Sequence, residues 1–212
     1  EGKVCNEVSR YYPLIQEKSG YSEQEPHEWV EKTVDALKEL VEQFAGNVSD
    51  IEGISFSGQM HGLVLLDEEK NVLRNAILWN DTRTTEQCQQ IYEMAGEARL
   101  LDITKNQALE GFTLPKLLWV KQYEPELFRQ AAIFLLPKDY LRYRLTGAIH
   151  SEYSDAAGTL LLNAGEKMWS EELCQIFGID AKLCPSLVES HDFVGTITEE
   201  IAELTGLAIE TK

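Results

Sequence analysis

The sequence lacks an excess of positive charge, and it also lacks long apolar runs. Its 212 residues carry 19 Lys and Arg against 36 Asp and Glu, which gives a formal net charge of −17. A protein that grips the nucleic-acid backbone needs a basic face, and so does an amphipathic helix on an anionic membrane, so the composition disfavours both classes. No uninterrupted apolar run exceeds about seven residues, far short of the roughly 18 that a membrane-crossing helix needs.

Several short motifs of known chemistry are absent as well. The four cysteines, Cys5, Cys88, Cys174 and Cys184, form no Cys-x-x-Cys pair and have no Cys or His partner at metal-ligand spacing. We therefore expect reduced thiols and a cytoplasmic protein. The chain contains no GxxxxGK[ST] phosphate loop and no GxGxxG, HExxH or GxSxG motif, so it carries no nucleotide cradle or hydrolase signature of those kinds.

What is present is the composition and periodicity of a layered α/β protein. Apolar residues make up 43% and charged residues 26%, which is ordinary for a globular chain. Segments with a 3.6-residue apolar period alternate with short apolar or alternating segments, a pattern typical of helices interleaved with strands. The expected helices span residues 26–46, 82–95, 112–123, 125–130, 138–145, 170–177 and 199–205. The expected strands span residues 4–12, 51–57, 63–67, 72–79, 131–136, 149–153 and 190–198, with a hairpin between the third and fourth.

Both ends of the chain suggest a piece of a larger protein. Glu1-Gly-Lys3 has the character of a turn, which predicts a hairpin whose first strand lies before Glu1. Near the other end, Thr198 is expected to cap a helix that stops at Gly206. A strand should follow in an alternating order, but only residues 207–212 remain.

The sharpest local feature is Ser57-Gly-Gln-Met-His-Gly62, in which two glycines bracket a polar triplet directly after an expected strand. Ligand crevices of layered α/β proteins form at strand ends. Gln59 and His61 could hydrogen-bond hydroxyl groups and Met60 could form an adaptable apolar wall, a set suited to a small polyol or sugar. The alternative is a corner between two strands that holds a hydrogen-bonded histidine.

Two further polar turns could contribute to the same crevice. Asn80 and Asp81 follow an expected strand, and the hairpin would bring them near His61; the alternative for Asp81 is a helix cap. Asp155, in Ser154-Asp-Ala-Ala-Gly-Thr159, could be an acid–base residue or simply a turn-forming Asp that bonds its own backbone.

Five segments, taken in their order along the chain, closely resemble motifs of the FGGY carbohydrate kinases, and in particular those of the xylulokinase branch of that family. The resemblance covers nearly the whole chain, and the Gln-Met-His triplet is its most specific part. The five segments are Ser57-Gly-Gln-Met-His-Gly62, Ala76-Ile-Leu-Trp-Asn-Asp-Thr-Arg83, Gly111-Phe-Thr-Leu-Pro-Lys-Leu-Leu-Trp119, Leu135-Leu-Pro-Lys-Asp-Tyr140 and Ser154-Asp-Ala-Ala-Gly-Thr159.

The resemblance implies an actin-like, ribonuclease-H-like fold, with a mixed sheet and flanking helices, of which residues 1–212 would be the N-terminal, sugar-binding domain without its first strand. It implies ATP-dependent phosphorylation of D-xylulose to D-xylulose 5-phosphate with Mg²⁺, and a possible homodimer. Met60 and His61 would bind the sugar, with Gln59, Asn80 and Asp81 as further pocket candidates. Positioning and charge neutralisation dominate such phosphoryl transfers.

The chain departs from the family pattern in two motifs. The family's Asp-x-Gly-Thr phosphate turn and the Gly-Gly-x-Asp segment with its catalytic Asp are not found in the sequence. We expect the first before Glu1 and the second beyond Lys212, with the ATP-binding half after it, so the catalytic residue is not assigned and the chain alone is expected to be inactive. The alternatives are a kinase for another ketose or polyol, and a stand-alone sugar-binding module.

Overall fold

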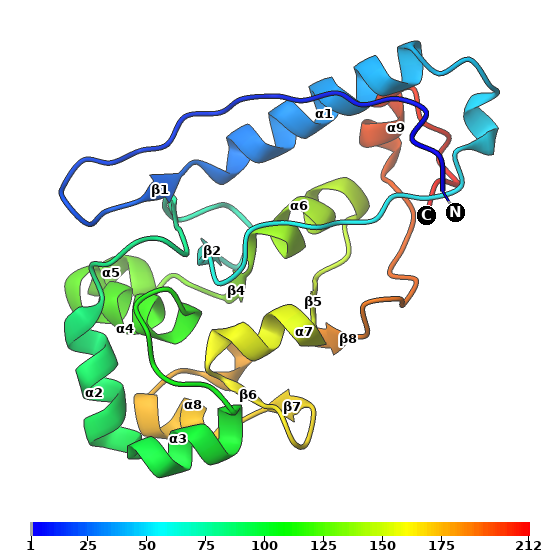
Figure 1. The fold of residues 1–212 in the computed structure, drawn as a ribbon. Helices are drawn as coiled ribbons and strands as arrows, with labels where there is room; N and C mark the ends of the chain where they lie inside the picture. Colours follow the sequence, from blue (N-terminus) through cyan, green and yellow to red (C-terminus); the bar gives the residue numbers. More distant parts are fainter. Residues whose placement is uncertain (1) are drawn as a thin grey trace.

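The computed structural model describes residues 2–212 and shows short strands among a larger number of helices (Figure 1). The helices are α1 (Pro26–Glu42), α2 (Thr85–Ala95), α3 (Glu97–Thr104), α4 (Thr113–Tyr123), α5 (Pro125–Phe128), α6 (Pro137–Thr146), α7 (Tyr153–Ala156), α8 (Glu171–Phe177) and α9 (Glu199–Thr205). The strands are β1 (Glu23–Gln24), β2 (Val64–Leu66), β3 (Ala76–Ile77), β4 (Ile133–Leu135), β5 (His150–Glu152), β6 (Leu162–Asn163), β7 (Met168–Trp169) and β8 (Ser186–Val188). Single 3₁₀ turns span Val48–Asp50, Ala157–Thr159 and Ala181–Leu183.

The expected hairpin is confirmed, and it lies at the centre of the fold. Antiparallel bridges join Leu66 to Val72 and Leu63 to Ile77, so the chain reverses between β2 and β3. On the other side β2 pairs antiparallel with β4, and β3 pairs with β1. The four strands thus form one small antiparallel ribbon in the order β1-β3-β2-β4.

Helices cover both faces of this ribbon, because alternate residues of β2 point in opposite directions. Leu63 and Leu65 pack in the apolar cluster that includes residues of α2, α4 and α8, whereas Val64 and Leu66 pack in the cluster that includes residues of α1 and α6. The two groups of helices lie on opposite sides of the strands (Figure 1). The result is a mixed α/β arrangement in layers, as the sequence predicts.

Helix α1 forms where the sequence places an amphipathic stripe. Pro26 occupies the first turn, where a missing N–H costs nothing, and Trp29 and Val30 are buried. The helix contacts α6 and α9, which lie along one side of it (Figure 1). It ends at Glu42 instead of reaching the expected stop at Gly46.

The last helix begins and ends as predicted. The Thr198 hydroxyl accepts a hydrogen bond from the Ile201 N–H at 3.3 Å, which is an N-cap, and Gly206 ends the helix with a left-handed φ of 78°. Ile201 packs with Leu145 and Leu207 in a third apolar cluster that extends onto α1.

Three predicted strands are wrong, namely residues 4–12, 51–57 and 190–198, which the structure shows without strand pairing. Segment 51–57 forms hydrogen bonds with the C-terminal residue instead, from the Ile54 N–H to the Lys212 carbonyl at 2.7 Å and from the Lys212 N–H to the Glu52 carbonyl at 3.1 Å. An alternating pattern produces a strand only where a neighbouring chain pairs with it, and pairing is a tertiary event. Helices α3 and α7, strands β1 and β8, and the β6–β7 pair were not predicted.

None of the helices in the described residues is both long enough and apolar enough to cross a membrane.

Candidate functional site

The loop at residues 57–62 holds His61 in an unusual backbone conformation. The Gly62 N–H donates to the Met60 carbonyl at 2.7 Å, which closes a three-residue γ-turn around His61. His61 itself has a positive φ of 61°, which most non-glycine residues avoid. A γ-turn with a positive central φ is the rare and strained form. Such strain persists only where surrounding contacts enforce it, and it concentrates at functional sites.

Glycines allow this loop to approach its neighbours closely. A methyl group at Gly62 would overlap the Pro137 ring, and one at Gly58 would lie 3.0 Å from the Lys138 side chain, so both bracketing glycines lie against the first turn of α6. A methyl group at Gly158, in the turn after α7, would overlap the His61 imidazole. Gly58 and Gly62, which bracket the polar triplet in the sequence, therefore allow the loop to pack closely against α6.

The His61 imidazole is fixed by two contacts from distant segments. Its Nδ1 lies 3.0 Å from the Gly158 carbonyl oxygen, and its ring lies against the Phe112 ring with centroids 4.5 Å apart. Burial lowers the pKa of His61 below its ordinary value, so the ring is neutral at neutral pH. A carbonyl can only accept, so the neutral ring carries its proton on Nδ1 and presents Nε2 as an acceptor.

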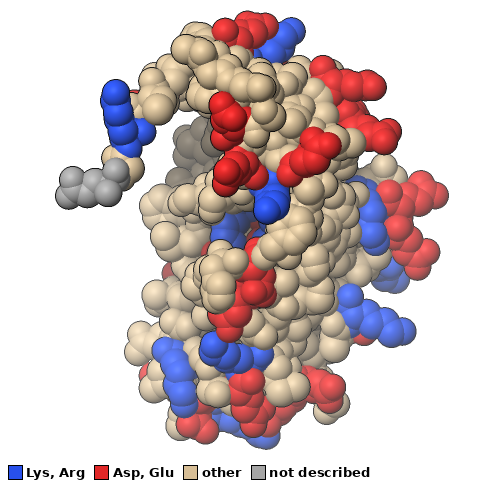
Figure 2. Space-filling model, turned by 90° about the vertical axis from the view of Figure 1, so that its right-hand side faces the viewer, with Lys and Arg blue, Asp and Glu red and all other residues tan. Residues whose placement is uncertain are grey.

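His61 and Met60 line a cavity of about 950 Å³. Its other walls come from segment 52–58, one face of α6 along its whole length, the α7 turn, segment 188–197 and Lys212. Figure 2 shows the corresponding hollow, with basic groups inside it and acidic groups around it. The volume lies within the range of small-molecule sites. Met60 is 54% exposed, which leaves its thioether free to contact a ligand.

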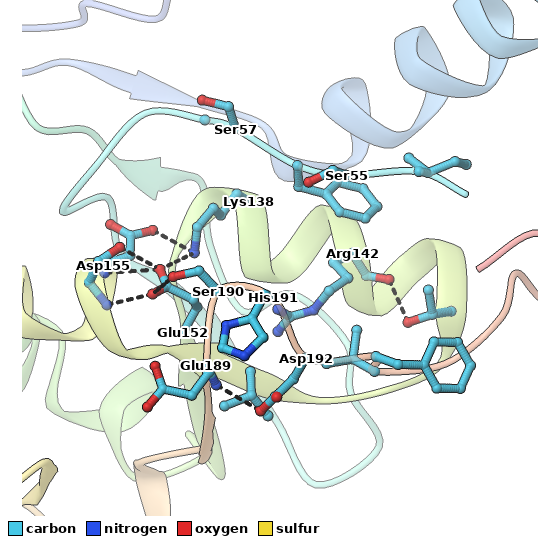
Figure 3. A pocket seen from close by; sticks show the side chains of 18 of the residues that line it. Ser55, Ser57, Lys138, Arg142, Glu152, Asp155, Glu189, Ser190, His191 and Asp192 are labelled. Atoms are coloured by element: carbon cyan, nitrogen blue, oxygen red, sulfur yellow. Dashed lines mark hydrogen bonds and ion pairs between the residues drawn. The ribbon is translucent and has the colours of Figure 1, made fainter. Parts of the chain in front are cut away.

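A network of charged side chains forms one wall of this cavity (Figure 3). The Lys138 ammonium, on α6, lies 3.0 Å from the Asp155 carboxylate, 3.1 Å from Asp139 and 3.8 Å from Glu152. Burial opposes the charge on Lys138, but Asp139 and Asp155 outweigh that effect and raise its pKa. Burial raises the pKa of Asp155 despite the contact with Lys138. The wall therefore offers both hydrogen-bond donors and acceptors for a polyhydroxylated ligand.

Glu152 is the most strongly perturbed carboxylate of the network. Its burial favours the neutral form, but hydrogen bonds from the hydroxyls of Ser190 and Ser154 and from the Ser154 N–H, together with the Lys138 charge, lower its pKa to about 2. These contacts tie α7 to segment 188–197, which begins beside Glu152 where β8 pairs with β5. The ionised Glu152 side chain thus joins two neighbouring segments of the cavity lining.

This pKa predicts a loss of stability in acid. A carboxylate whose pKa is lower in the folded state stabilises the fold fully above its unfolded pKa of about 4.5, and this contribution is lost as the pH falls toward about 2. The contribution at neutral pH is roughly 3 kcal/mol.

We therefore expect Glu152→Gln to be less stable than the native chain at pH 7, with a difference that shrinks between pH 4.5 and 2. Urea unfolding at several pH values measures it. Glu166→Gln, at an exposed carboxylate, is the control, and a difference independent of pH would contradict the assignment.

The structure places the Asn80–Asp81 turn away from this cavity. Asp81 is buried, and its carboxylate accepts hydrogen bonds from the Ser22 N–H at 2.6 Å and from the Arg83 guanidinium at 2.7 and 2.9 Å. Asn80 is exposed, and neither residue lines the cavity. The expectation that this turn shares a crevice with His61 is therefore corrected. The hairpin does form, but Asp81 is needed to fix the chain before β1.

Gln59 also lies outside the cavity lining, although it belongs to the same loop. Its amide donates to the Gln24 side-chain oxygen at 2.9 Å, and the same oxygen accepts from the Trp29 indole at 3.1 Å. The side chain of Gln59 is therefore occupied by a contact between the loop and the start of α1. Of the five candidates, the structure brings Met60 and His61 to the cavity.

Sequence reasoning missed the residues that support His61. Lys116 is fully buried in the first turns of α4, and its ammonium donates to the carbonyls of His61, at 2.9 Å, and Gly111. Burial lowers the pKa of Lys116 to about 7, despite the attraction of Asp81. The available signal was a lone lysine within the otherwise apolar residues 114–120 at the start of this helix. The signals for Lys138 and Gly158 were weaker. Each lies in one of the five segments that resemble the family, but the sequence analysis predicted no role for either residue.

Comparison with known proteins shows the family to which the chain belongs. The model of the N-terminal domain of the FGGY family of carbohydrate kinases matches residues 1–211. The chain belongs to the FGGY family of carbohydrate kinases. This FGGY chain is 63% identical over 211 residues to the xylulose kinase of Bacillus subtilis, and covers 100% of its own length and 42% of that relative. The chain therefore spans less than half the length of this curated relative.

Solved structures share the fold. A ligand-bound xylulose kinase from Lactobacillus acidophilus superposes with a TM-score of 0.90 at 30% identity, over 97% of the FGGY chain and 41% of that structure. A structure titled as a gluconate kinase, also from Lactobacillus acidophilus, gives the same TM-score of 0.90 and the same 30% identity, over 97% and 41%. The actin-like, ribonuclease-H-like fold expected from the sequence is confirmed, as is the family.

Proposed function

We propose that this chain supplies the sugar-binding wall of an ATP-dependent D-xylulose kinase that forms D-xylulose 5-phosphate in the cytoplasm. The observation that carries the proposal is the position of Met60 and His61, held together on the wall of a cavity of about 950 Å³. The similarity to xylulose kinases supports D-xylulose as the sugar. In this proposal the apolar side of the sugar chain lies on Met60 and a hydroxyl group donates to Nε2 of His61.

The side chains around the cavity suit an uncharged polyol. A sugar hydroxyl can both donate and accept, and the wall offers an imidazole acceptor at His61, an ammonium donor at Lys138 and a carboxylate acceptor at Asp155. Fixed donors and acceptors orient an acceptor hydroxyl, and orientation contributes much of the rate of phosphoryl transfer. The carboxylates Asp155, Glu152 and Glu189 disfavour a strongly anionic ligand at the same wall.

ATP and Mg²⁺ belong to the proposal but not to these residues. Within residues 2–212 there is no group of three or more His, Cys, Asp or Glu side chains that could hold a metal ion. The donors present therefore do not fit a resident metal, and no step is assigned to one. The proposal places the nucleotide, its metal and the general base on other parts of a full-length kinase.

A panel of substrates tests the proposal. A full-length kinase that contains this chain should phosphorylate D-xylulose with a kcat/KM at least about 10-fold above that for L-ribulose, gluconate or glycerol. The 212-residue chain should bind D-xylulose in calorimetry and leave ATP unconsumed. Preference for another ketose or polyol would replace D-xylulose in the proposal but retain the kinase. Sugar binding without phosphorylation by the full-length protein would instead favour a sugar-binding module.

A further inference from the structure

The His61 γ-turn is held from the start of α4 by two donors to a single carbonyl oxygen. The Thr113 hydroxyl donates to the His61 carbonyl at 3.1 Å, and the Lys116 ammonium donates to the same oxygen at 2.9 Å. Thr113 and Lys116 are three residues apart and lie on one face of α4. The residue before them, Phe112, stacks against the His61 ring. The beginning of α4 thus contacts both the backbone and the side chain of His61.

Lys116 is a costly residue at this position. It is fully buried, and a positive charge in the first turns of a helix is opposed by the helix dipole. Charge pairing does not explain its burial, because the hydrogen-bond partners of its ammonium are the backbone carbonyls of His61 and Gly111. A buried lysine that serves packing alone would be replaced by an apolar residue at a gain in stability. Local choices that oppose stability concentrate at functional sites.

We propose that Lys116, with Thr113 as the second donor to the same oxygen, is a positioning residue that holds the strained His61 turn in its sugar-binding conformation by donating to the His61 carbonyl. The turn keeps a positive φ at His61 only while contacts stabilise it, and the carbonyl of the strained residue is the atom on which Lys116 and Thr113 converge. Without Lys116 the turn relaxes and the imidazole leaves Phe112 and the Gly158 carbonyl. This proposal rests on the proposed sugar-binding function of His61.

The test compares two lysines of the same helix in the 212-residue chain. Lys116→Met removes the ammonium and keeps the length of the side chain. Lys121→Met is a matched control, because Lys121 also donates to two backbone carbonyls, those of Phe177 and Gly178, at 2.9 and 2.8 Å, but on α8, away from the cavity. Two readouts are recorded for each variant, the NMR cross-peak between the rings of His61 and Phe112, and the affinity for D-xylulose in calorimetry.

We expect Lys116→Met to lose the cross-peak and to weaken D-xylulose binding by at least about 10-fold, while Lys121→Met retains both. Thr113→Val removes the second donor at almost unchanged shape, and should weaken binding by about 2- to 5-fold. This variant decides the question if Lys116→Met fails to fold.

Retention of the cross-peak and of the affinity in Lys116→Met, or in Thr113→Val if only that variant folds, would overturn the proposal. The cross-peak does not depend on any ligand, so it separates this proposal from the proposed function. Loss of the cross-peak with unchanged sugar affinity would leave Lys116 as the residue that orders His61, and would refute a sugar-binding role for His61.

Discussion

Replacement of His61 by alanine should lower the kcat/KM for D-xylulose by about 10- to 100-fold in a full-length kinase that contains this chain. The imidazole is neutral, and its Nδ1 is bonded to the Gly158 carbonyl at 3.0 Å, so Nε2 is the atom that can accept from a sugar hydroxyl. Loss of that bond leaves the hydroxyl unpaired and costs roughly 1–3 kcal/mol. Steady-state kinetics with D-xylulose and with ATP varied separately measure the effect, and the KM for ATP should change little.

A second variant checks that the effect comes from the position of the ring. Gly158→Ala keeps the imidazole but displaces it, since the added methyl group would overlap the ring. It should reproduce most of the loss in sugar kcat/KM. If His61 is only a packed corner residue, His61→Ala should lower the thermal midpoint and leave the sugar kinetics nearly intact, and that pattern would refute the binding role.

Asp81→Ala should destabilise the fold by about 3 kcal/mol, without direct involvement of the sugar site. The Asp81 side chain is fully buried and pairs with Arg83, whose side chain is 2% exposed, at 2.7 Å. Its carboxylate also holds the Ser22 N–H at 2.6 Å, which fixes the chain just before β1. Removal of the Asp81 carboxylate leaves the buried Arg83 guanidinium with fewer partners and the buried Ser22 N–H without its acceptor. Arg83 keeps Glu23 at 2.7 Å, so the expected cost lies at the lower end of the range for broken buried pairs.

Urea unfolding of the 212-residue chain measures this cost. Asp102→Ala is the control, because Asp102 pairs with Lys105 on the surface with its side chain 86% exposed, and its unfolding midpoint should not move. An Asp81→Ala variant that unfolds at the native urea midpoint would contradict the structural role. Native stability together with a raised KM for the sugar in the full-length kinase would instead favour a role for Asp81 in the sugar pocket.

Much of the fold could be predicted because its signals are local. Helix α1 follows from its apolar stripe and Pro26, helix α9 from the Thr198 cap and Gly206, and the β2–β3 hairpin from the polar turn between two apolar segments. The glycine-bracketed loop also identified Met60 and His61 as a pair. These features depend on residues within a few positions of one another, so the local sequence contains the information.

Segment 51–57 and the Asn80–Asp81 turn show where local signals are insufficient. The alternating residues of segment 51–57 fit a strand, but the structure shows it without strand pairing. The sequence suggested a helix cap or a pocket residue for Asp81, and it did not indicate the buried pair that the structure shows. The structure selected Ser22 and Arg83 as its partners, and Ser22 lies 59 residues away.

By itself, the sequence determined the layered α/β class, most of the longer helices, the central hairpin, the family resemblance and the loop that carries His61. Only the tertiary structure decided what holds that loop, because the contacts come from residues far along the chain. Gly158 is 97 residues from His61 and Lys116 is 55 residues from it. Periodicity and caps describe how a segment folds locally, whereas the strained turn, the neutral imidazole and the buried lysine exist only once distant segments have packed together.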